Sequence, residues 1–306
     1  SGVVMLVGTD SGIPMKFHSQ STWNELDVWV NHFGMDPLLT IKAATYWPAV
    51  AMKVDKDYGT ISEGKYADII AVRGDVIRYI NLLQNVDVVI VGGGMVGLGL
   101  AAALKNSALT IAIVEGQLPD TQLGEAPDNR VSALSLASQR ILQGVGAWDG
   151  IAARRLQPYD SMEVWEQDSF GHIDFDAASL RQPALGHIVE NRVVQDALLD
   201  RLHDCDLGLL ANARLEQMRR SGDDWLLTLT DGRQLRAPLL VAADGANSAV
   251  RRLAGCATRE WDYLHHAIVT SVRCSKPHQA TAWQRFTDDG PLAFLPLAGP
   301  AGEHWC

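Results

Sequence analysis

The sequence has little cysteine and no excess of positive charge. Its four cysteines, Cys205, Cys256, Cys274 and Cys306, lie far apart and include no C-x-x-C pair, which argues against a zinc knuckle or a disulfide scaffold. Lys and Arg number 26 against 36 Asp and Glu, a formal net charge of −10. No basic surplus is available to neutralise a nucleic-acid backbone. We therefore expect no nucleic-acid partner and a cytoplasmic protein.

Long apolar runs are also lacking. The longest stretch without a charged residue, Val88–Leu104, has 17 residues and contains five glycines, short of the ~20 apolar residues of a transmembrane helix. The N-terminus shows no basic region, so no signal peptide is expected. The chain does have a core-forming composition, with 47% hydrophobic and 20% charged residues among 306. That length suits about two domains of ~100–200 residues.

Lysine is scarce after residue 86. Residues 1–86 hold five Lys and two Arg, whereas residues 87–306 hold two Lys and 17 Arg. Both cations serve equally well on a solvated surface, so folding does not require this change. Chance or different surface roles would explain it, but we favour the joining of two stretches of different ancestry. The expected domains are therefore residues 1–86 and 87–306.

The first segment carries three phrases typical of one enzyme family. They are GTDSG after the apolar run Val3–Val7, then ATYWPAVAM and GTISEGKYADIIAV. With these phrases, residues 1–86 resemble the C-terminal end of an imidazolonepropionase-like amidohydrolase, a metal-dependent (β/α)₈ barrel that hydrolyses C–N bonds. The resemblance implies that Asp10 matches the catalytic, metal-binding aspartate after the last barrel strand.

A metal site is nevertheless not expected in this segment. Catalytic zinc sites use about three protein ligands, and the histidines present, His18 and His32, fit no ligand motif. The seven barrel strands that should precede Val3–Val7 are lacking as well. We expect Asp10 to be a turn or cap residue, with no bound metal and no hydrolase activity.

The second segment opens with a glycine-rich turn between two expected strands. A β-branched run, Asp87–Val91, leads into a G-x-G-x-x-G sequence and a small-residue helix over Leu98–Lys105. The next strand, Thr110–Val114, ends in Glu115, 18 residues after Gly97. This is the dinucleotide-binding fingerprint, in which an acidic residue follows the turn by about 20 residues. The pattern predicts a Rossmann-like α/β domain.

Each glycine of the fingerprint has a physical task. Gly92 allows the tight turn, Gly94 lets the backbone approach a pyrophosphate, and Gly97 lets helix and strand pack closely. The N-terminus of the helix favours the negative charge of a phosphate. The carboxylate of Glu115, at the end of the second strand, would accept hydrogen bonds from ribose hydroxyls. The expected contacts to the dinucleotide are Gly92, Gly94, Met95, Val96, Gly97 and Glu115.

An acidic turn follows a later apolar strand. Leu239–Ala243 is expected to be a buried strand that delivers Asp244 and Gly245 at its C-terminal end. Such a strand can place a carboxylate near a cofactor, although Asp-Gly is also an ordinary turn sequence. We expect Asp244 and Gly245 to belong to the cofactor site.

Longer phrases connect residues 87–306 with one family of flavoenzymes. They are VDVVIVGGGMVGLGLAAAL, DNRVSALSLAS, MEVWEQDSFGHIDF, LGHIVENRVV, LVAADGANSAVR, WDYLHHAIV and LAFLPL. With them the segment resembles the class A flavoprotein aromatic hydroxylases, and among these the 2-polyprenylphenol hydroxylases of ubiquinone biosynthesis. The resemblance implies FAD as cofactor and places Arg130 close to the flavin. It also implies that Glu190 and Asn191 make polar contacts to the ribityl region.

The resemblance implies a reaction as well. NAD(P)H reduces FAD, reduced FAD activates O₂, and a small aromatic or prenylated phenol is hydroxylated, while the protein supplies placement and water exclusion. No catalytic side chain is assigned. A third family motif, a GDAAH-type stretch, does not occur before Cys306, so we expect a truncated domain with an incomplete flavin site. Because the family acts on a lipid substrate, peripheral contact with a membrane is left open.

The expected fold is α/β, with a Rossmann-like FAD-binding domain and an incomplete amidohydrolase fragment before it. Two strand-rich stretches, Met162–Phe175 and His265–Leu297, would form a β-sheet layer on the substrate side. We favour an incomplete FAD-dependent, NAD(P)H-using monooxygenase. A metal-dependent hydrolase and a non-catalytic composite that binds FAD or ADP remain alternatives. Without its barrel, residues 1–86 would expose apolar helices and favour self-association.

Overall fold

The computed structural model describes residues 5–7, 25–66, 76–77, 80, 86–203 and 207–306. The chain forms two compact units, and each unit is built from three separate segments of the sequence. The first unit comprises residues 1–93, 104–118 and 203–257, and the second comprises residues 94–103, 119–202 and 258–306. Each unit is described by itself.

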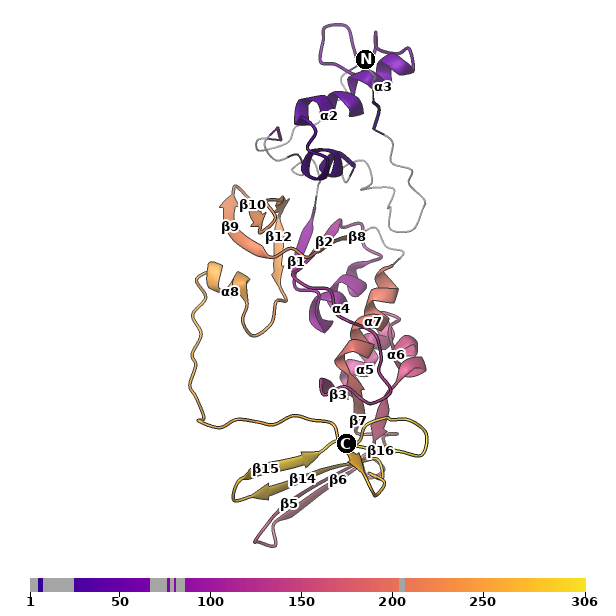
Figure 1. Cartoon of the computed structure of the whole chain (residues 1–306), viewed down its shortest axis with the longest axis vertical. Helices are drawn as coiled ribbons and strands as arrows, with labels where there is room; N and C mark the ends of the chain where they lie inside the picture. The colour runs from indigo at the N-terminus through magenta and orange to yellow at the C-terminus, as the bar shows by residue number, and fades with distance from the viewer. Residues whose placement is uncertain (1–4, 8–24, 67–75, 78–79, 81–85, 204–206) are drawn as a thin grey trace. The chain divides into compact units, whose positions relative to one another are not determined.

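A four-stranded parallel sheet forms the centre of the first unit (Figure 1). Its strand order is β12 (Leu239–Ala242), β1 (Val88–Val91), β2 (Ile111–Glu115) and β8 (Leu207–Ala211). All three pairings are parallel. The two central strands are apolar and buried apart from Glu115 at the end of β2, as expected for strands of a parallel sheet covered on both faces. The α/β expectation is therefore confirmed.

A three-stranded antiparallel sheet completes this unit. It consists of β9 (Leu215–Ser221), β10 (Asp224–Leu229) and β11 (Gln234–Ala237) in the order β11-β10-β9. The alternating side chains Leu227 and Leu229 of the middle strand are fully buried. They belong to the same apolar cluster as Val89 and Val114 of the parallel sheet. One continuous core thus supports both sheets of the unit.

The N-terminal part of the described chain is helical. It contains a π-helical turn η1 (Val28–His32), α2 (Pro37–Ala44) and α3 (Tyr46–Ala51). Asp36 caps α2 by accepting a hydrogen bond from the Leu39 amide at 2.8 Å, as the Asp-Pro sequence predicts. The expected strand at Val3–Val7 is not formed at residues 5–7, where the Val7 amide instead donates to the carbonyl of Ala43.

The second unit contains most of helix α4 (Met95–Leu104), three further helices and several strands. The further helices are α5 (Leu136–Gly144), α6 (Trp148–Arg154) and α7 (Asn191–Leu202). A three-stranded sheet has the order β3 (Val131–Ser135), β7 (Gly186–Glu190), β4 (Gln157–Tyr159). Tyr159 and Ile188 of this sheet share an apolar cluster with Ala282 and Leu297.

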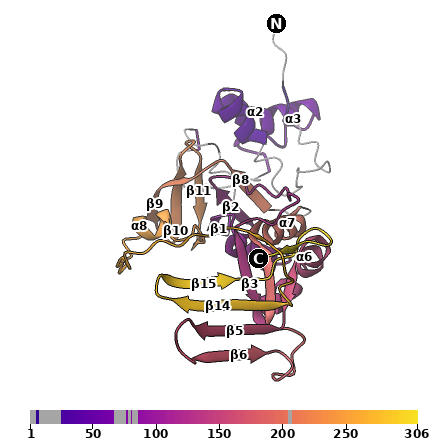
Figure 2. The ribbon, with the colours of Figure 1, turned by 60° about the horizontal axis from the view of Figure 1, so that its bottom comes forward.

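The two stretches expected to be strand-rich form a four-stranded sheet in the second unit (Figure 2). Its order is β15 (Gly290–Phe294), β14 (Thr281–Thr287), β5 (Ser161–Glu166) and β6 (His172–Asp176). The pair β14–β5 is parallel, and the two outer pairings are antiparallel. The second unit also contains a short antiparallel pair of strands, β13 (Arg273–Cys274) and β16 (His304–Trp305).

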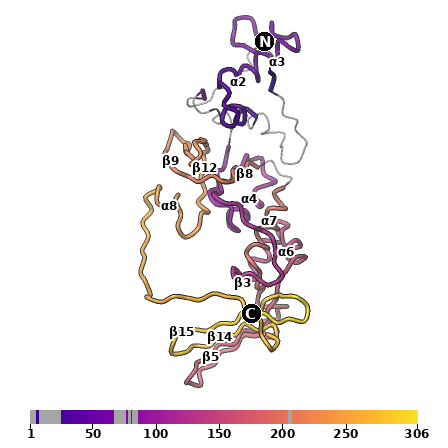
Figure 3. The backbone as a smooth tube through the Cα atoms, in the orientation of Figure 1, coloured from indigo at the N-terminus to yellow at the C-terminus, as the bar shows by residue number. Residues whose placement is uncertain are grey.

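Two strand expectations need correction. Residues 256–272 contain neither helix nor strand (Figure 3), so the stretch from His265 becomes strand-rich only at Arg273. The strand β12 forms as expected, but it is an edge strand and Leu239 is 52% exposed. An apolar run does not by itself tell an edge strand from a central one, because the burial depends on the neighbours that the fold provides.

Candidate functional site

The turn after β1 requires glycine at its first position. Gly92 has φ +111°, a backbone conformation that residues with a side chain rarely adopt. A Cβ at this position would overlap the carbonyl oxygen of Ala243, which follows β12, and lie 2.8 Å from the amide nitrogen of Asp244. The turn and the end of β12 are therefore in backbone contact.

Glu115 lies at the C-terminal end of β2, beside the same turn. Its Oε2 accepts a hydrogen bond from the Gly93 amide at 2.5 Å, and its Oε1 accepts one from the Gln117 amide at 2.8 Å. The side chain is half-buried. An ionised carboxylate offers about four acceptor positions, so these two bonds leave capacity for hydroxyl donors of a ligand.

The remaining fingerprint residues open helix α4 (Met95–Leu104). The Leu98 amide donates to the carbonyl of Gly94 at 2.9 Å, so the amides before Leu98 have no acceptor within the helix. A Cβ on Gly94 would meet no atom within 4 Å, while Gly97 is buried and Val96 is 75% exposed. The helix N-terminus thus offers free amides and open space, which is the arrangement that a phosphate needs.

Asp244 forms hydrogen bonds that order the start of α8 (Ala249–Leu253). Its carboxylate accepts the Ser248 hydroxyl at 2.5 Å and the amides of Ala249 and Val250 at 2.7 and 3.2 Å. Burial raises the pKa of this carboxyl, but the hydrogen bonds from Ser248 and the backbone amides outweigh it and the pKa is lowered. Gly245 beside it has φ +79° and open space around it.

In the second unit, Arg130 directly precedes β3. Its side chain is exposed, and among the described residues its guanidinium has no hydrogen-bond or ion-pair partner. Its backbone is fixed, because the Asn191 amide donates to its carbonyl at 2.9 Å. The Asn191 side chain in turn accepts from the Ser132 hydroxyl at 2.6 Å. Arg130 is therefore an exposed cation on an ordered backbone, with no side-chain partner in the part of the chain that the structure describes.

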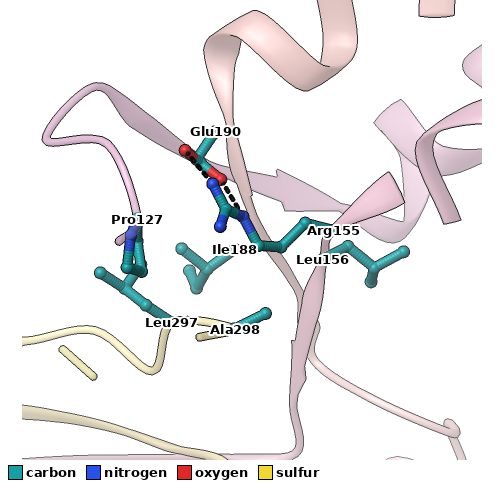
Figure 4. Close-up of a pocket in the computed structure, with 7 residues that line it drawn as sticks. All are labelled: Pro127, Arg155, Leu156, Ile188, Glu190, Leu297 and Ala298. Atoms are coloured by element: carbon teal, nitrogen blue, oxygen red, sulfur yellow. Dashed lines mark hydrogen bonds and ion pairs between the residues drawn. The ribbon is translucent and has the colours of Figure 1, made fainter. Parts of the chain in front are cut away.

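Glu190, at the end of β7, is buried and engaged by protein groups. It is 5% exposed and forms a two-point ion pair with Arg155. The pair lies in a small pocket (Figure 4) whose walls are otherwise mostly apolar, lined by Pro127, Arg155, Leu156, Ile188, Glu190, Leu297 and Ala298. The Glu190 carboxylate also accepts the Asp128 amide at 2.8 Å. Both of its oxygens thus have protein partners.

The predicted residues fall into two groups. In the first unit, Gly92, Glu115 and Asp244 lie around one turn. In the second unit, Arg130 and Glu190 lie at adjoining ends of β3 and β7. Sequence reasoning did not single out Arg155, since nothing distinguishes it from the neighbouring Arg154 in the sequence.

The expected amidohydrolase residue, Asp10, lies outside the described residues. Within the described part of the chain, no group of three or more His, Cys, Asp or Glu side chains could hold a metal ion. In the same part, no helix is both long and apolar enough to cross a membrane.

Two protein families match this chain. Residues 85–306 match the family described as FAD binding domain, and residues 1–96 match the amidohydrolase family. The 3-demethoxyubiquinol 3-hydroxylase of Escherichia coli (strain K12) is 41% identical over 216 residues, which cover 70% of this chain and 55% of that protein. Ubiquinone hydroxylase UbiL of Rhodospirillum rubrum is 38% identical and covers 70% of this chain and 49% of its own. The chain spans about half the length of these relatives.

Solved structures show the same fold. The structure of PqsL, a probable FAD-dependent monooxygenase from Pseudomonas aeruginosa, has a TM-score of 0.60 at 20% identity and covers 72% of this chain and 59% of that one. Two features are compatible with the ADP half of FAD: a Cβ on Gly94 would meet no atom within 4 Å, and the α4 amides before Leu98 lack intrahelical acceptors. The amidohydrolase match is confined to the first 96 residues. The chain belongs to the FAD binding domain family.

Proposed function

We propose that this chain is the FAD-binding part of an aromatic-ring monooxygenase of the ubiquinone-biosynthesis type. The observation that carries the proposal is the turn after β1, in which Glu115 accepts the Gly93 amide and keeps spare acceptor capacity. The next residue, Gly94, has open space where a Cβ would stand. The family match over residues 85–306 and the two ubiquinone hydroxylases among the relatives support it.

The residues of the turn would hold the ADP half of the cofactor. Glu115 would accept hydrogen bonds from the ribose hydroxyls, and the amides of Met95, Val96 and Gly97 at the start of α4 would face the pyrophosphate. A Cβ on Gly94 would meet no atom within 4 Å, which leaves room for a ligand at this residue. Asp244 and Gly245 would bound the pyrophosphate from the turn after β12, which already contacts Gly92 through the backbone.

Bound FAD would supply the redox chemistry, accepting reducing equivalents from NAD(P)H and activating O₂ for hydroxylation of a phenol ring. The protein supplies position and charge. Arg130 would approach the flavin as an exposed cation without a protein partner among the described residues. A prenylated phenol is the proposed substrate class, because relatives of this chain are named for ubiquinone hydroxylation.

We also propose that the domain boundary lies near residue 86. The two family matches overlap at residues 85–96, and the change from lysine to arginine falls at the same place. Residues 1–86 would then be an amidohydrolase remnant without hydrolase activity, and their apolar helices would favour self-association. Exposed apolar side chains on these helices, such as Leu38 of α2 and Val50 of α3, support this.

The test is the visible absorption spectrum of the purified chain, followed by release and identification of any nucleotide. About one FAD per chain, retained or taken up on addition, is the expected result. Gly94→Glu should abolish it, because a negatively charged side chain would occupy the open space proposed for the pyrophosphate. Gly144→Glu adds the same charge at another open position, the last residue of α5, and should bind FAD normally. A wild-type chain that takes up no FAD would contradict the proposal.

A further inference from the structure

The segment that leads to Arg130 is tied down by two arginines. Residues 122–130, here called the Arg130 arm, lie directly before β3 and form neither helix nor strand. Arg155 donates through Nη1 to the carbonyls of Gly124 and Glu125, each at 3.1 Å. Arg192 donates to the carbonyl of Gln122 at 2.5 Å. Both cations therefore bind the backbone of an otherwise irregular segment.

The last residues of the arm are held just as closely. Arg192 binds the carboxylate of Asp128 through Nε at 2.8 Å and Nη2 at 2.6 Å. Burial raises the pKa of Asp128, but the hydrogen bonds from Arg192 and from backbone amides outweigh this and lower it. Ser271 also binds the arm, because its amide donates a hydrogen bond to the Asn129 side chain at 3.0 Å.

Glu190 connects these ties to the sheet. Arg155 donates through Nε to its Oε2 at 2.5 Å and through Nη2 to its Oε1 at 3.0 Å, while Oε1 also accepts the Asp128 amide. Figure 4 shows the guanidinium of Arg155 directed at this carboxylate, with Pro127 of the arm across the pocket. The pair is the one point at which β7, the end of α6 and the arm share hydrogen bonds among the contacts described here.

Stability alone does not account for this arrangement. Buried ion pairs often contribute no more to stability than well-packed apolar side chains of similar volume. Their advantage is geometric, because a fork of N–H donors on a carboxylate permits one orientation. Arg154 offers a contrast one residue away, since it pairs with Asp196 and Asp200 of α7 and, among the described residues, forms no hydrogen bond with the arm.

We propose that Arg155 and Glu190 are positioning residues that set the place of Arg130 for the flavin through the Arg130 arm. The inference rests on the proposed function, because it takes Arg130 to be a flavin contact. The pair itself does not touch the cofactor in this proposal. It fixes the arm at Gly124, Glu125 and Asp128, so that the exposed guanidinium of Arg130 is presented without further ordering cost on binding.

The experiment measures FAD affinity by titration and amide exchange of the arm by mass spectrometry in the cofactor-free protein. Arg155→Ala should raise the Kd for FAD about tenfold, which corresponds to ~1.4 kcal/mol, and should accelerate exchange across residues 122–130. Arg155→Lys keeps the charge but loses the paired N–H donors of the guanidinium. Its Kd for FAD and its exchange rate should lie between those of wild type and Arg155→Ala. Arg154→Ala is the matched control and should change neither quantity.

A double-mutant cycle separates positioning from general destabilisation. If Arg155 acts through Arg130, the effect of Arg155→Ala on FAD affinity should vanish in an Arg130→Ala background, because coupled residues are not additive. Additive effects, or equal FAD affinity in Arg155→Ala and Arg154→Ala, would overturn the inference while leaving FAD binding intact. If Arg155→Ala does not fold, Arg155→Lys is compared with Arg154→Lys instead. The same two measurements, FAD affinity and amide exchange of the arm, then test the inference. A wild-type chain without FAD affinity would overturn the proposed function and this inference with it.

Discussion

The Gly93 amide donates a hydrogen bond to the Glu115 carboxylate at 2.5 Å, which joins the glycine turn after β1 to the end of β2. The same carboxylate binds the Gln117 amide beyond the strand. Glu115 therefore orders two backbone segments of the protein, and it does so whether or not it also binds a ligand. Variants at this position should be judged by both stability and affinity.

Gly92 and Gly94 should differ sharply when each is replaced by alanine. Gly92→Ala forces a Cβ into the backbone of Ala243 at a positive φ, and we expect a loss of at least about 1–3 kcal/mol in the free energy of unfolding. Gly94→Ala meets no atom within 4 Å and should leave unfolding nearly unchanged while weakening FAD binding. Urea unfolding and FAD titration of both variants check this. Equal unfolding free energies would contradict it.

Glu115→Ala should weaken FAD binding by about tenfold or more, since hydrogen bonds to a charged group contribute roughly 1.5–3 kcal/mol. Glu115→Gln retains one carbonyl acceptor and should lose less. The comparison variant is Glu216→Ala, which removes an exposed carboxylate on β9, outside both the turn and the Arg130 arm. Isothermal titration with FAD gives the three affinities, and an unchanged value for Glu115→Ala would remove this residue from the cofactor site.

The parallel sheet and its turn could be predicted because the local sequence determines them. The runs Val88–Val91 and Ile111–Glu115 are continuous and apolar, and a helix and a glycine turn separate them at the expected spacing. The cap at Asp36 was predictable for the same reason, since Asp followed by Pro acts on its own helix. Such features depend on residues close together in the chain.

Features that depend on distant residues were not predictable. Local rules predict that Pro48 ends the helix that begins at Pro37. In the structure α2 ends at Ala44 and Pro48 lies in the first turn of α3, where proline is tolerated. The strand-rich stretch expected from His265 begins only at Arg273, because the residues before it find no strand partner. The Arg155–Glu190 pair joins residues 35 apart in sequence, and no local pattern marks it.

Asp244 should make the stability of the first unit depend on pH in the acidic range. Its pKa is lowered in the folded chain from a usual value of 3.8, so its contribution is complete above that value and is lost as the pH falls through the folded-state pKa. Asp244→Asn should therefore lower the free energy of unfolding at pH 7 by about 1 kcal/mol. The difference from wild type should shrink at about pH 3. Denaturant unfolding of both proteins at the two pH values provides the test, and a constant difference would assign the effect to packing.

Cys306 should react slowly with alkylating reagents. Burial, with the Cys274 thiol beside it, raises the pKa of Cys306 to about 12 from a usual value of 9.0. Because the thiolate is the reactive form, its thiolate fraction at pH 8 is about a thousandfold below that of a thiol with the usual pKa. Cys256 is exposed and should be labelled first by iodoacetamide, as followed by peptide mass spectrometry. In denaturant the two rates should converge, since the difference arises from the folded surroundings. Equal rates in the native chain would show that Cys306 is not buried beside Cys274.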